Sequence, residues 1–241
     1  MQKLGISLVL FVMLAVSACK EPELPAIEKR ERVYLHIVNL YQPIPSLDMD
    51  FEAFEQKQAT IKDLQTFQSW PQGGYASLLS IHKPDSAKNV FGGLYFTIMN
   101  HFTGEVIFPK KIYDLQTVVP NTFAVIDVQG VPTVIRAADT FDSLNYKTSG
   151  VRFMDLSNNK ASLSLVTTDS VVKHENMSYL GYTPFKKFPT GTYKFRLIDA
   201  QNVLDTVYRF DPITIQPGRN YAFYAYDLVT DVKAFYEKIE K

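Results

Sequence analysis

The sequence has little cysteine and no excess of charge of either sign. Cys19 is its single cysteine, so no disulfide can form within the chain, and the fold must be stabilised by burial of its core. The 25 Lys and Arg residues are balanced by 25 Asp and Glu residues. Because no basic excess is available to neutralise phosphates, nucleic acid is not expected among the partners of this protein.

The motifs of common catalytic sites are also missing. The sequence has no Gly-x-Ser-x-Gly, no His-Glu-x-x-His and no phosphate-binding glycine loop, and no cysteine follows Cys19. His36, His82 and His101 share no ligand spacing, so neither a metal nor a cofactor is expected. No pair of carboxylates is singled out for glycoside hydrolysis. We therefore expect a protein that is not an enzyme.

Aromatic residues, in contrast, are plentiful, with 17 Phe and 14 Tyr. They favour strands, because planar side chains fit a pleated surface. Residues 47–53 alternate between apolar side chains and Asp48, Asp50 and Glu52. Alternate residues of a strand lie about 7 Å apart, so three such carboxylates are poorly placed to share one cation, and a solvated strand face is the simpler interpretation.

The first eighteen residues resemble a signal peptide. Lys3 precedes an apolar run at 4–16, which is too short to span a membrane comfortably but suits a signal-peptide core. Residues 16–19 (Val-Ser-Ala-Cys) resemble the bacterial lipobox, in which the cysteine is lipidated and becomes the new N-terminus. We therefore expect Cys19 to anchor the protein in a membrane through acyl chains. The alternative is a plain secretory signal with a chance cysteine.

Residues 19–32 are expected to be the lipidated cysteine and a flexible tether, because they contain prolines and no apolar periodicity. Residues 20–23 (Lys-Glu-Pro-Glu) resemble the acidic export tag of some Gram-negative lipoproteins. They favour a lipid-anchored protein of the outer membrane that is exposed on the cell surface. The periplasmic face of that membrane is the alternative.

An aromatic-Pro-x-Gly-x-Tyr motif occurs twice, at residues 70–75 and 188–193, 118 residues apart. Proline at its second position and glycine at its fourth predict a type I turn. The same offset aligns Val33 with Val151, and an offset of 97 later aligns Pro120 with Pro217. These matches indicate an internal duplication whose first copy has an excess at about 82–112.

The duplication predicts two domains. The first covers residues 33–139, the second covers 151–241, and the polar segment 140–150 is the linker between them. Pro217 and Gly218 predict a type II turn. The last segment, 231–239, fits either an edge strand or a short helix.

Three aromatic residues are candidates for ligand contact. Tyr221 and Phe223 are expected to face inward, which leaves Tyr224 and Tyr226 facing outward. This outward pair either stacks on a sugar or a partner, or covers the interface with the neighbouring domain. Trp70 is the third candidate, although Phe188 matches it in the second copy, which favours a packing role.

Several of these segments resemble an uncharacterised tandem domain family of bacterial surface lipoproteins. The resemblance is carried by the strand at 151–153 (Val-Arg-Phe), the alternating strand at 47–50, both Pro-x-Gly-x-Tyr copies and the tyrosine-rich strand that follows Pro217. The family implies two tandem immunoglobulin-like β-sandwich domains, hence an all-β fold. It implies no activity.

These observations together favour a non-catalytic, membrane-anchored lipoprotein that acts as a surface binding, adhesion or spacer module, with a protein or a glycan as partner. One alternative is a glycan-binding accessory lipoprotein that uses Trp70, Tyr224 or Tyr226 as a stacking platform. Another is a fimbrial subunit-like protein, which would require a removable first strand and a donor strand.

Overall fold

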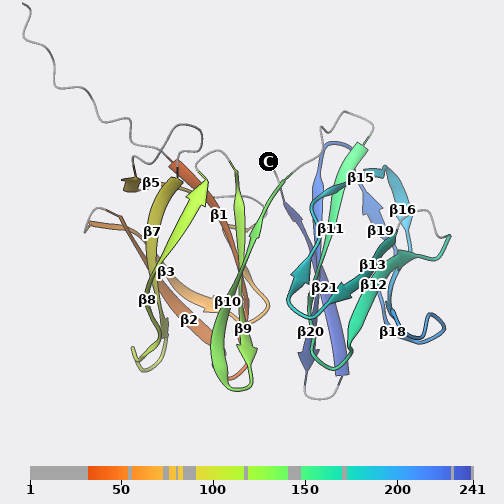
Figure 1. The fold of residues 1–241 in the computed structure, drawn as a ribbon, viewed down its shortest axis with the longest axis horizontal. Helices are drawn as coiled ribbons and strands as arrows, with labels where there is room; N and C mark the ends of the chain where they lie inside the picture. Colours follow the sequence, from red (N-terminus) through yellow and green to blue (C-terminus); the bar gives the residue numbers. More distant parts are fainter. Residues whose placement is uncertain are drawn as a thin grey trace, which may run out of the picture. The chain divides into compact units, whose positions relative to one another are not determined.

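The computed structural model describes residues 32–53, 56–72, 76–79, 81–83, 91–116, 119–140, 148–169, 173–228 and 231–239 (Figure 1). These residues form strands, turns and loops, which confirms the predicted all-β fold. None of them belongs to a helix that is long and apolar enough to cross a membrane. The predicted signal peptide, Cys19 and nearly all of the tether lie outside the described residues.

The first sandwich consists of two five-stranded sheets. The first inner sheet has the order β10-β9-β1-β4, and β5 also pairs with β1; the first outer sheet has the order β3-β2-β7-β6, and β8 also pairs with β7. The strands are β1 (Arg32–Leu40), β2 (Ser46–Ala53), β3 (Gln56–Gln65), β4 (Ser69–Trp70), β5 (Ala76–Leu79), β6 (Ile81–Lys83), β7 (Phe91–Asn100), β8 (Val106–Gln116), β9 (Asn121–Val128) and β10 (Val131–Ala138).

The second sandwich has a similar construction. The second inner sheet has the order β14-β11-β20-β21, and β15 also pairs with β11; the second outer sheet has the order β13-β12-β17-β18, and β16 pairs with β19. The strands are β11 (Thr148–Leu156), β12 (Ser162–Thr167), β13 (Lys173–Ser178), β14 (Gly181–Tyr182), β15 (Lys186–Pro189), β16 (Gly191–Tyr193), β17 (Phe195–Asp199), β18 (Thr206–Arg209), β19 (Ile213–Ile215), β20 (Asn220–Leu228) and β21 (Asp231–Ile239).

The same strand pairings recur in both sandwiches. β1 runs parallel to β9, and β11 runs parallel to β20. In the outer sheets β7 lies between β2 and β8, as β17 lies between β12 and β18. This topology makes β7 the equivalent of β17, although β7 falls within the excess inferred at 82–112. β5 pairs with β1 as β15 pairs with β11. Among the described strands, β6, which pairs with β7, is the one before β7 that has no such equivalent before β17.

The repeated aromatic-proline motif differs from the predicted turn in its second copy. There the chain stays extended from β15 of the inner sheet through β16 and on to β17 of the outer sheet. Gly191, the first residue of β16, has φ +149°, a backbone conformation that favours glycine. The motif therefore marks a crossing between sheets. In the first copy, residues 73–75 lie outside the described residues.

Two other local predictions agree with the structure. Gly218 has φ +71°, as the third residue of a type II turn requires. The segment 231–239 is the edge strand β21, which pairs with β20 along its whole length.

Alternate residues of the inner strands face their own outer sheet and form the core of each sandwich. In the first sandwich, β1 contributes Val33, Leu35 and Ile37, which pack against Phe51 and Phe96 among others. In the second, β11 and β20 contribute Val151, Phe153, Tyr221 and Phe223. Each sandwich thus buries an apolar core of its own.

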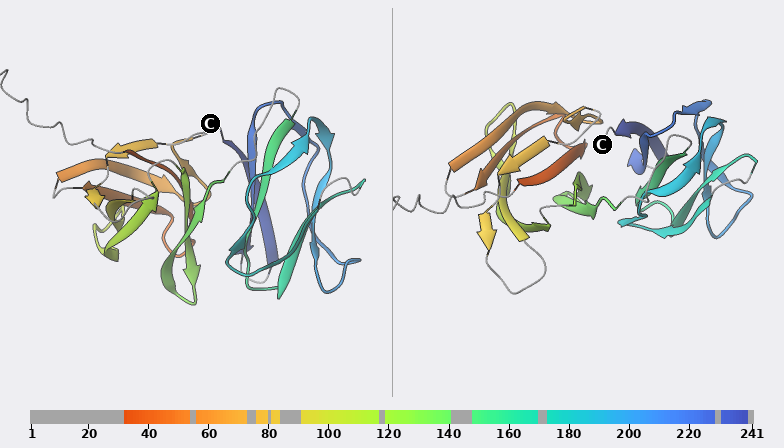
Figure 2. Two further views of the ribbon diagram at one scale, coloured as in Figure 1. Left: turned by 45° about the horizontal axis from the view of Figure 1, so that its top comes forward. Right: turned by 90° about the horizontal axis from the view of Figure 1, so that it is seen from above.

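The intervening residues of the same strands are buried as well, because the two inner sheets face each other (Figures 1 and 2). We call this interface the seam. Its buried apolar residues come from both sandwiches and are Val38, Leu40, Ala124, Ile126, Ala137, Met154, Leu156, Phe185, Ala222, Tyr224 and Ile239. Strands that are apolar on both faces are typical of sheets covered on both sides. The seam makes a third core that the two sandwiches share.

Candidate binding site at the seam

A buried ion pair lies at the centre of the seam. The Arg152 guanidinium, which is 1% exposed, donates to the carboxylate of Asp139 and, at 2.7 Å, to Thr122 Oγ1. Thr122 Oγ1 also donates to the Asp139 carboxylate at 2.7 Å. The guanidinium lies over the ring of Phe185, 4.6 Å from its centroid. Arg152 thus ties β9 and the residue that follows β10 of the first sandwich to β11 of the second.

A second group of buried polar side chains extends this connection. The Tyr224 hydroxyl donates to Glu237 Oε1 at 2.6 Å, and His36 Nε2 lies 2.6 Å from the same oxygen. Burial raises the pKa of Tyr224 well above its ordinary value. Burial alone would raise the pKa of Glu237, but the His36 imidazole and the hydrogen bonds from His36 and Tyr224 lower it. Because His36 belongs to β1 and Glu237 to β21, this contact also joins the two sandwiches.

These positions correct the prediction for Tyr224. Its side chain does face away from the core of its own sandwich, but it is fully buried in the seam and has no exposed surface for a ligand. It stacks on Phe235, with 4.9 Å between the ring centroids. The alternative interpretation, in which Tyr224 covers the interface between domains, matches this position.

The other two candidates lie in different parts of the structure. Trp70 is half-buried and stacks on Phe51 of the first core, with 6.0 Å between the centroids. Tyr226 is half-buried at the edge of the seam, with its ring 4.7 Å from that of Phe67. Tyr226 also lines a pocket at this edge of the seam.

The three carboxylates of β2 each have a separate partner. Asp48 accepts hydrogen bonds from Lys62 Nζ at 2.6 Å and from the Asp63 backbone N–H at 3.0 Å, and it lies 2.8 Å from His101 Nδ1. Asp50 accepts from Thr60, and Glu52 pairs with Lys110. Within the described residues, no three His, Cys, Asp or Glu side chains converge in a way that could hold a metal ion.

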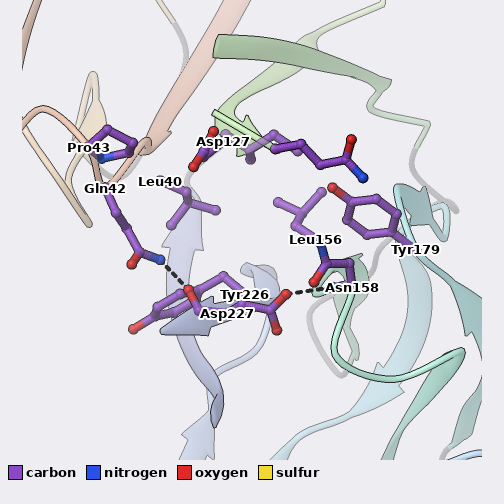
Figure 3. Close-up of a pocket in the computed structure, with 11 residues that line it drawn as sticks. Leu40, Gln42, Pro43, Asp127, Leu156, Asn158, Tyr179, Tyr226 and Asp227 are labelled. Carbon is purple, nitrogen blue, oxygen red and sulfur yellow. Dashed lines mark hydrogen bonds between the residues drawn. The ribbon is translucent and has the colours of Figure 1, made fainter. Parts of the chain in front are cut away.

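A pocket of about 480 Å³ opens at one end of the seam (Figure 3). We call it the seam pocket. Both sandwiches contribute to it, through residues that are distant in sequence: Leu40, Gln42, Pro43, Ile126, Asp127 and Gln129 from the first, and Leu156, Asn158, Tyr179, Tyr226 and Asp227 from the second. Such a pocket exists only while the two inner sheets are in contact.

The seam pocket has an aliphatic floor and a polar rim. Leu40, Ile126 and Leu156 are buried seam residues and form the floor. The side chains of Gln42, Asp127, Asn158, Tyr179 and Asp227 surround this floor (Figure 3). A few placed polar groups around an apolar surface are typical of sites for small ligands or single side chains.

Hydrogen bonds fix part of this rim. The Asp227 carboxylate accepts from the Ser157 hydroxyl and, at 2.7 Å, from the backbone N–H of Asn158. The Gln42 side-chain amide donates to the backbone carbonyl of Asp227, so this contact spans the two sandwiches. The rim near Asp227 is therefore held in place before any ligand arrives.

The seam pocket is also electrically negative. Among the described residues that line it, Asp127 and Asp227 are charged and none is Lys, Arg or His. The pKa of Tyr179 is raised by burial first, and then by the charges of Asp227, Asp127 and Asp155. These carboxylates favour a neutral or cationic ligand over an anionic one.

The pKa values of two buried groups in the second sandwich are shifted in opposite directions. Burial raises the pKa of Asp155 to about 7, and the nearby charge of Asp227 adds to that rise, although hydrogen bonds from the backbone oppose it. Burial also lowers the pKa of His174 to about 4, helped by the charge of Lys186. The folded state thus keeps a proton on Asp155 and excludes one from His174 across the mildly acidic range.

These shifts predict a pH profile of stability. As pH rises from about 4 to about 7 the unfolded chain loses the Asp155 proton first, so this group's contribution to stability falls. As pH falls from about 6.5 to about 4, His174 is protonated in the unfolded chain before it is protonated in the folded one. The contribution of His174 to stability therefore falls as well. The two slopes oppose each other in the wild type.

In Asp155→Asn the opposing slope of Asp155 is absent. We expect the free energy of unfolding of this variant to rise between about pH 4 and 6.5, with His174 contributing at most about 1.4 kcal/mol per pH unit. At about pH 8 the variant should exceed the wild type, because no carboxylate charge is buried there. Urea denaturation across this range checks both points, and a variant with the wild-type profile would contradict the burial argument.

Comparisons with known proteins give only distant likenesses. No family model and no curated protein sequence matches the chain. Among solved structures, the tip fimbrial protein Mfa3 from Porphyromonas gingivalis is 10% identical, with a TM-score of 0.25, over 87% of this chain and 100% of that one. A putative adhesin from Bacteroides ovatus is 11% identical, with a TM-score of 0.21, over 85% and 92%.

A putative cell adhesion protein from Bacteroides eggerthii is similar to the same degree, with 8% identity and a TM-score of 0.20 over 88% of this chain and 96% of that one. These structural neighbours are fimbrial and putative adhesion proteins. At such TM-scores no function is transferred from them to this chain.

Proposed function

We propose that this chain is a non-catalytic, membrane-anchored lipoprotein whose two sandwiches act together as one rigid binding or adhesion module at the cell surface. The observation that carries the proposal is the seam. Its buried ion pair, hydrogen bonds and apolar residues join the inner sheets. A module fixed in this way presents one combined surface, with the seam pocket in it, instead of two domains that reorient independently.

The charged side chains of the seam support a structural role for this interface. Arg152 and Asp139 are directed at each other, and Glu237 is directed at His36 and Tyr224. Buried charges in such pairs stabilise an arrangement only while every partner is in place. They therefore favour a single relative position of the sandwiches, which suits a module that holds a partner against mechanical or thermal displacement.

The membrane anchor rests on the sequence alone and has its own test. In cells grown with radiolabelled palmitate, the full-length protein should carry the label and Cys19→Ala should not. Protease added to intact cells should remove the wild-type protein from the outer surface. Unlabelled wild type would contradict the lipid anchor. Labelled protein that is fully protected from protease would contradict surface exposure and favour the periplasmic face.

The fimbrial alternative requires the first strand to be removable. In the structure β1 pairs with β9 along one edge and with β4 and β5 along the other. Its Val33, Leu35 and Ile37 belong to the core of the first sandwich, and its Val38 and Leu40 belong to the seam. Release of β1 would open both cores, so the geometry favours a strand that stays in the folded protein.

A further inference from the structure

We propose that the seam pocket binds a basic side chain, that of lysine or arginine, from a partner polypeptide. The proposal rests on the proposed function, since it names the class of partner that the binding module takes. It is argued from three properties of the pocket: its aliphatic floor, the sign of its charge and the position of its tyrosines.

The floor suits the methylene stem of a basic side chain. Leu40 and Ile126 from the first sandwich and Leu156 from the second present aliphatic surface at the bottom of a pocket of about 480 Å³. Lysine and arginine carry three or four methylene groups below a charged end, and they bury that stem on apolar surface while the charged end finds acceptors. The polar rim of the pocket lies where this charged end would be.

The charge of the rim selects a cation. The Asp227 carboxylate already accepts two hydrogen bonds, from Ser157 and Asn158, and these neutral donors leave its negative charge in place. Asp127 is exposed on the opposite side of the pocket (Figure 3). Clefts lined by one sign of charge focus the electric field and attract the opposite charge. A neutral sugar would gain little from that field, and an anion would be repelled.

The two tyrosines complete the site. Tyr179 and Tyr226 line the pocket from the second sandwich, and the hydroxyl of Tyr179 points toward its interior (Figure 3). The phenolic oxygen of Tyr179 can accept a hydrogen bond from an ammonium or guanidinium group in the pocket. The side-chain carbonyls of Gln42 and Asn158 add acceptors for ammonium or guanidinium N–H groups.

Binding in this pocket should also stabilise the contact between the sandwiches. Its lining comes from both inner sheets, so the ligand binds the docked state and not the separated one. A partner that inserts a basic side chain therefore stiffens the module at the moment it is captured.

The test uses the full-length protein in detergent and fluorescent nonapeptides of glycine and serine that differ only at the central residue: lysine, arginine or norleucine. We expect the lysine and arginine peptides to bind about tenfold more tightly than the norleucine peptide, which has the stem but no charge. Raised salt should reduce this difference, since part of the attraction is screened.

Three variants assign the binding to the seam pocket. Asp127→Asn should weaken binding of the lysine peptide by about fivefold. Gln129→Lys, which places a cation at the rim, should weaken it by more. Glu105→Gln removes an equal charge from the exposed turn between β7 and β8 and should change nothing. Unchanged thermal unfolding of the exposed-site variants shows that they are folded.

Equal binding of the lysine and norleucine peptides would overturn the proposal, as would full binding by Asp127→Asn and Gln129→Lys. Capture of a neutral oligosaccharide from a glycan array would overturn it in favour of a sugar site, provided that Tyr226→Ala abolishes the capture and Asp127→Asn does not. A negative result in these assays would not contradict the proposed cell-surface location or the rigid seam. Those two claims are tested separately, by protease treatment of cells and by unfolding.

Discussion

Replacing Arg152 by methionine is expected to lower the free energy of unfolding by about 3–5 kcal/mol. The side chain is 1% exposed and its partner Asp139 is also fully buried, so the variant leaves a carboxylate in the seam without its countercharge. Proteins of this size are stabilised by only about 5–15 kcal/mol, so the loss should be plain in urea denaturation. It should also loosen the contact between the sandwiches.

Two further variants separate the ion pair from simple packing. The double variant Arg152→Met/Asp139→Asn also removes the charge of the unpaired carboxylate. Most of the lost stability should return, because the cost lies in that buried carboxylate. Arg209→Met, on the exposed side of β18, should change stability by less than about 0.5 kcal/mol. If Arg152→Met behaved like Arg209→Met, the buried pair would not be holding the seam.

Truncating Tyr224 to alanine should destabilise the protein by about 3–5 kcal/mol, as the loss of a large buried side chain does. Its ring stacks on Phe235 and its hydroxyl donates to Glu237, both at the seam. Tyr224→Phe keeps the ring and should lose only about 1–3 kcal/mol, the cost of leaving buried polar groups without a partner. Thermal and urea unfolding of both variants measure these losses.

Tyr226 provides the comparison, because it lies two residues away on the same face of β20 but is half-buried at the edge. Tyr226→Ala should therefore cost clearly less stability than Tyr224→Ala. Equal costs would contradict the assignment of Tyr224 to the shared core. A binding assay on Tyr224→Ala would report mostly on this loss of stability, which makes Tyr226 the better residue for testing ligand contact.

The alternation of side chains along β20 shows which features of the fold can be predicted from the sequence. It placed Tyr221 and Phe223 on one face and Tyr224 and Tyr226 on the other, and the structure has the same two faces. What the second face meets is decided by a sheet about a hundred residues earlier in the chain. Local periodicity gives the side of a strand on which a residue lies, but not whether that side is covered.

Two further features of the sequence are typical of strands with covered faces. Val38, Leu40, Ala124 and Ile126 make their strands apolar on both sides, which is typical of strands between two layers. Arg152 lies on the seam face of β11 between the apolar residues Val151 and Phe153, where a charged side chain indicates a buried partner. The sequence alone does not identify Asp139 as that partner, because the contact depends on how the inner sheets meet.

The strand β3 was not predicted, for a different reason. Most of its residues are polar, and among its described side chains Ile61 and Leu64 are the buried apolar ones. The pairing with β2 shifts register twice, and Asp63 has φ +55°, so no regular alternation survives in the sequence. Polar composition and irregularity are common in edge strands, where they discourage pairing with other chains.

The seam pocket could not be predicted for a related reason. Its lining combines strand ends and turns from residue 40 to residue 227. Of these residues only Tyr226 had a pattern that singled it out. A site assembled from two domains follows from their docking geometry, which no local motif encodes.

The most direct test of the rigid two-sandwich module is whether both sandwiches unfold together. Trp70, the single tryptophan, reports on the first sandwich through its fluorescence. Hydrogen exchange of the backbone amides of β12 and β17 reports on the outer sheet of the second. With a shared core, both signals should change at the same urea concentration and in one cooperative transition. Two separate midpoints, with one sandwich native while the other is unfolded, would contradict the account.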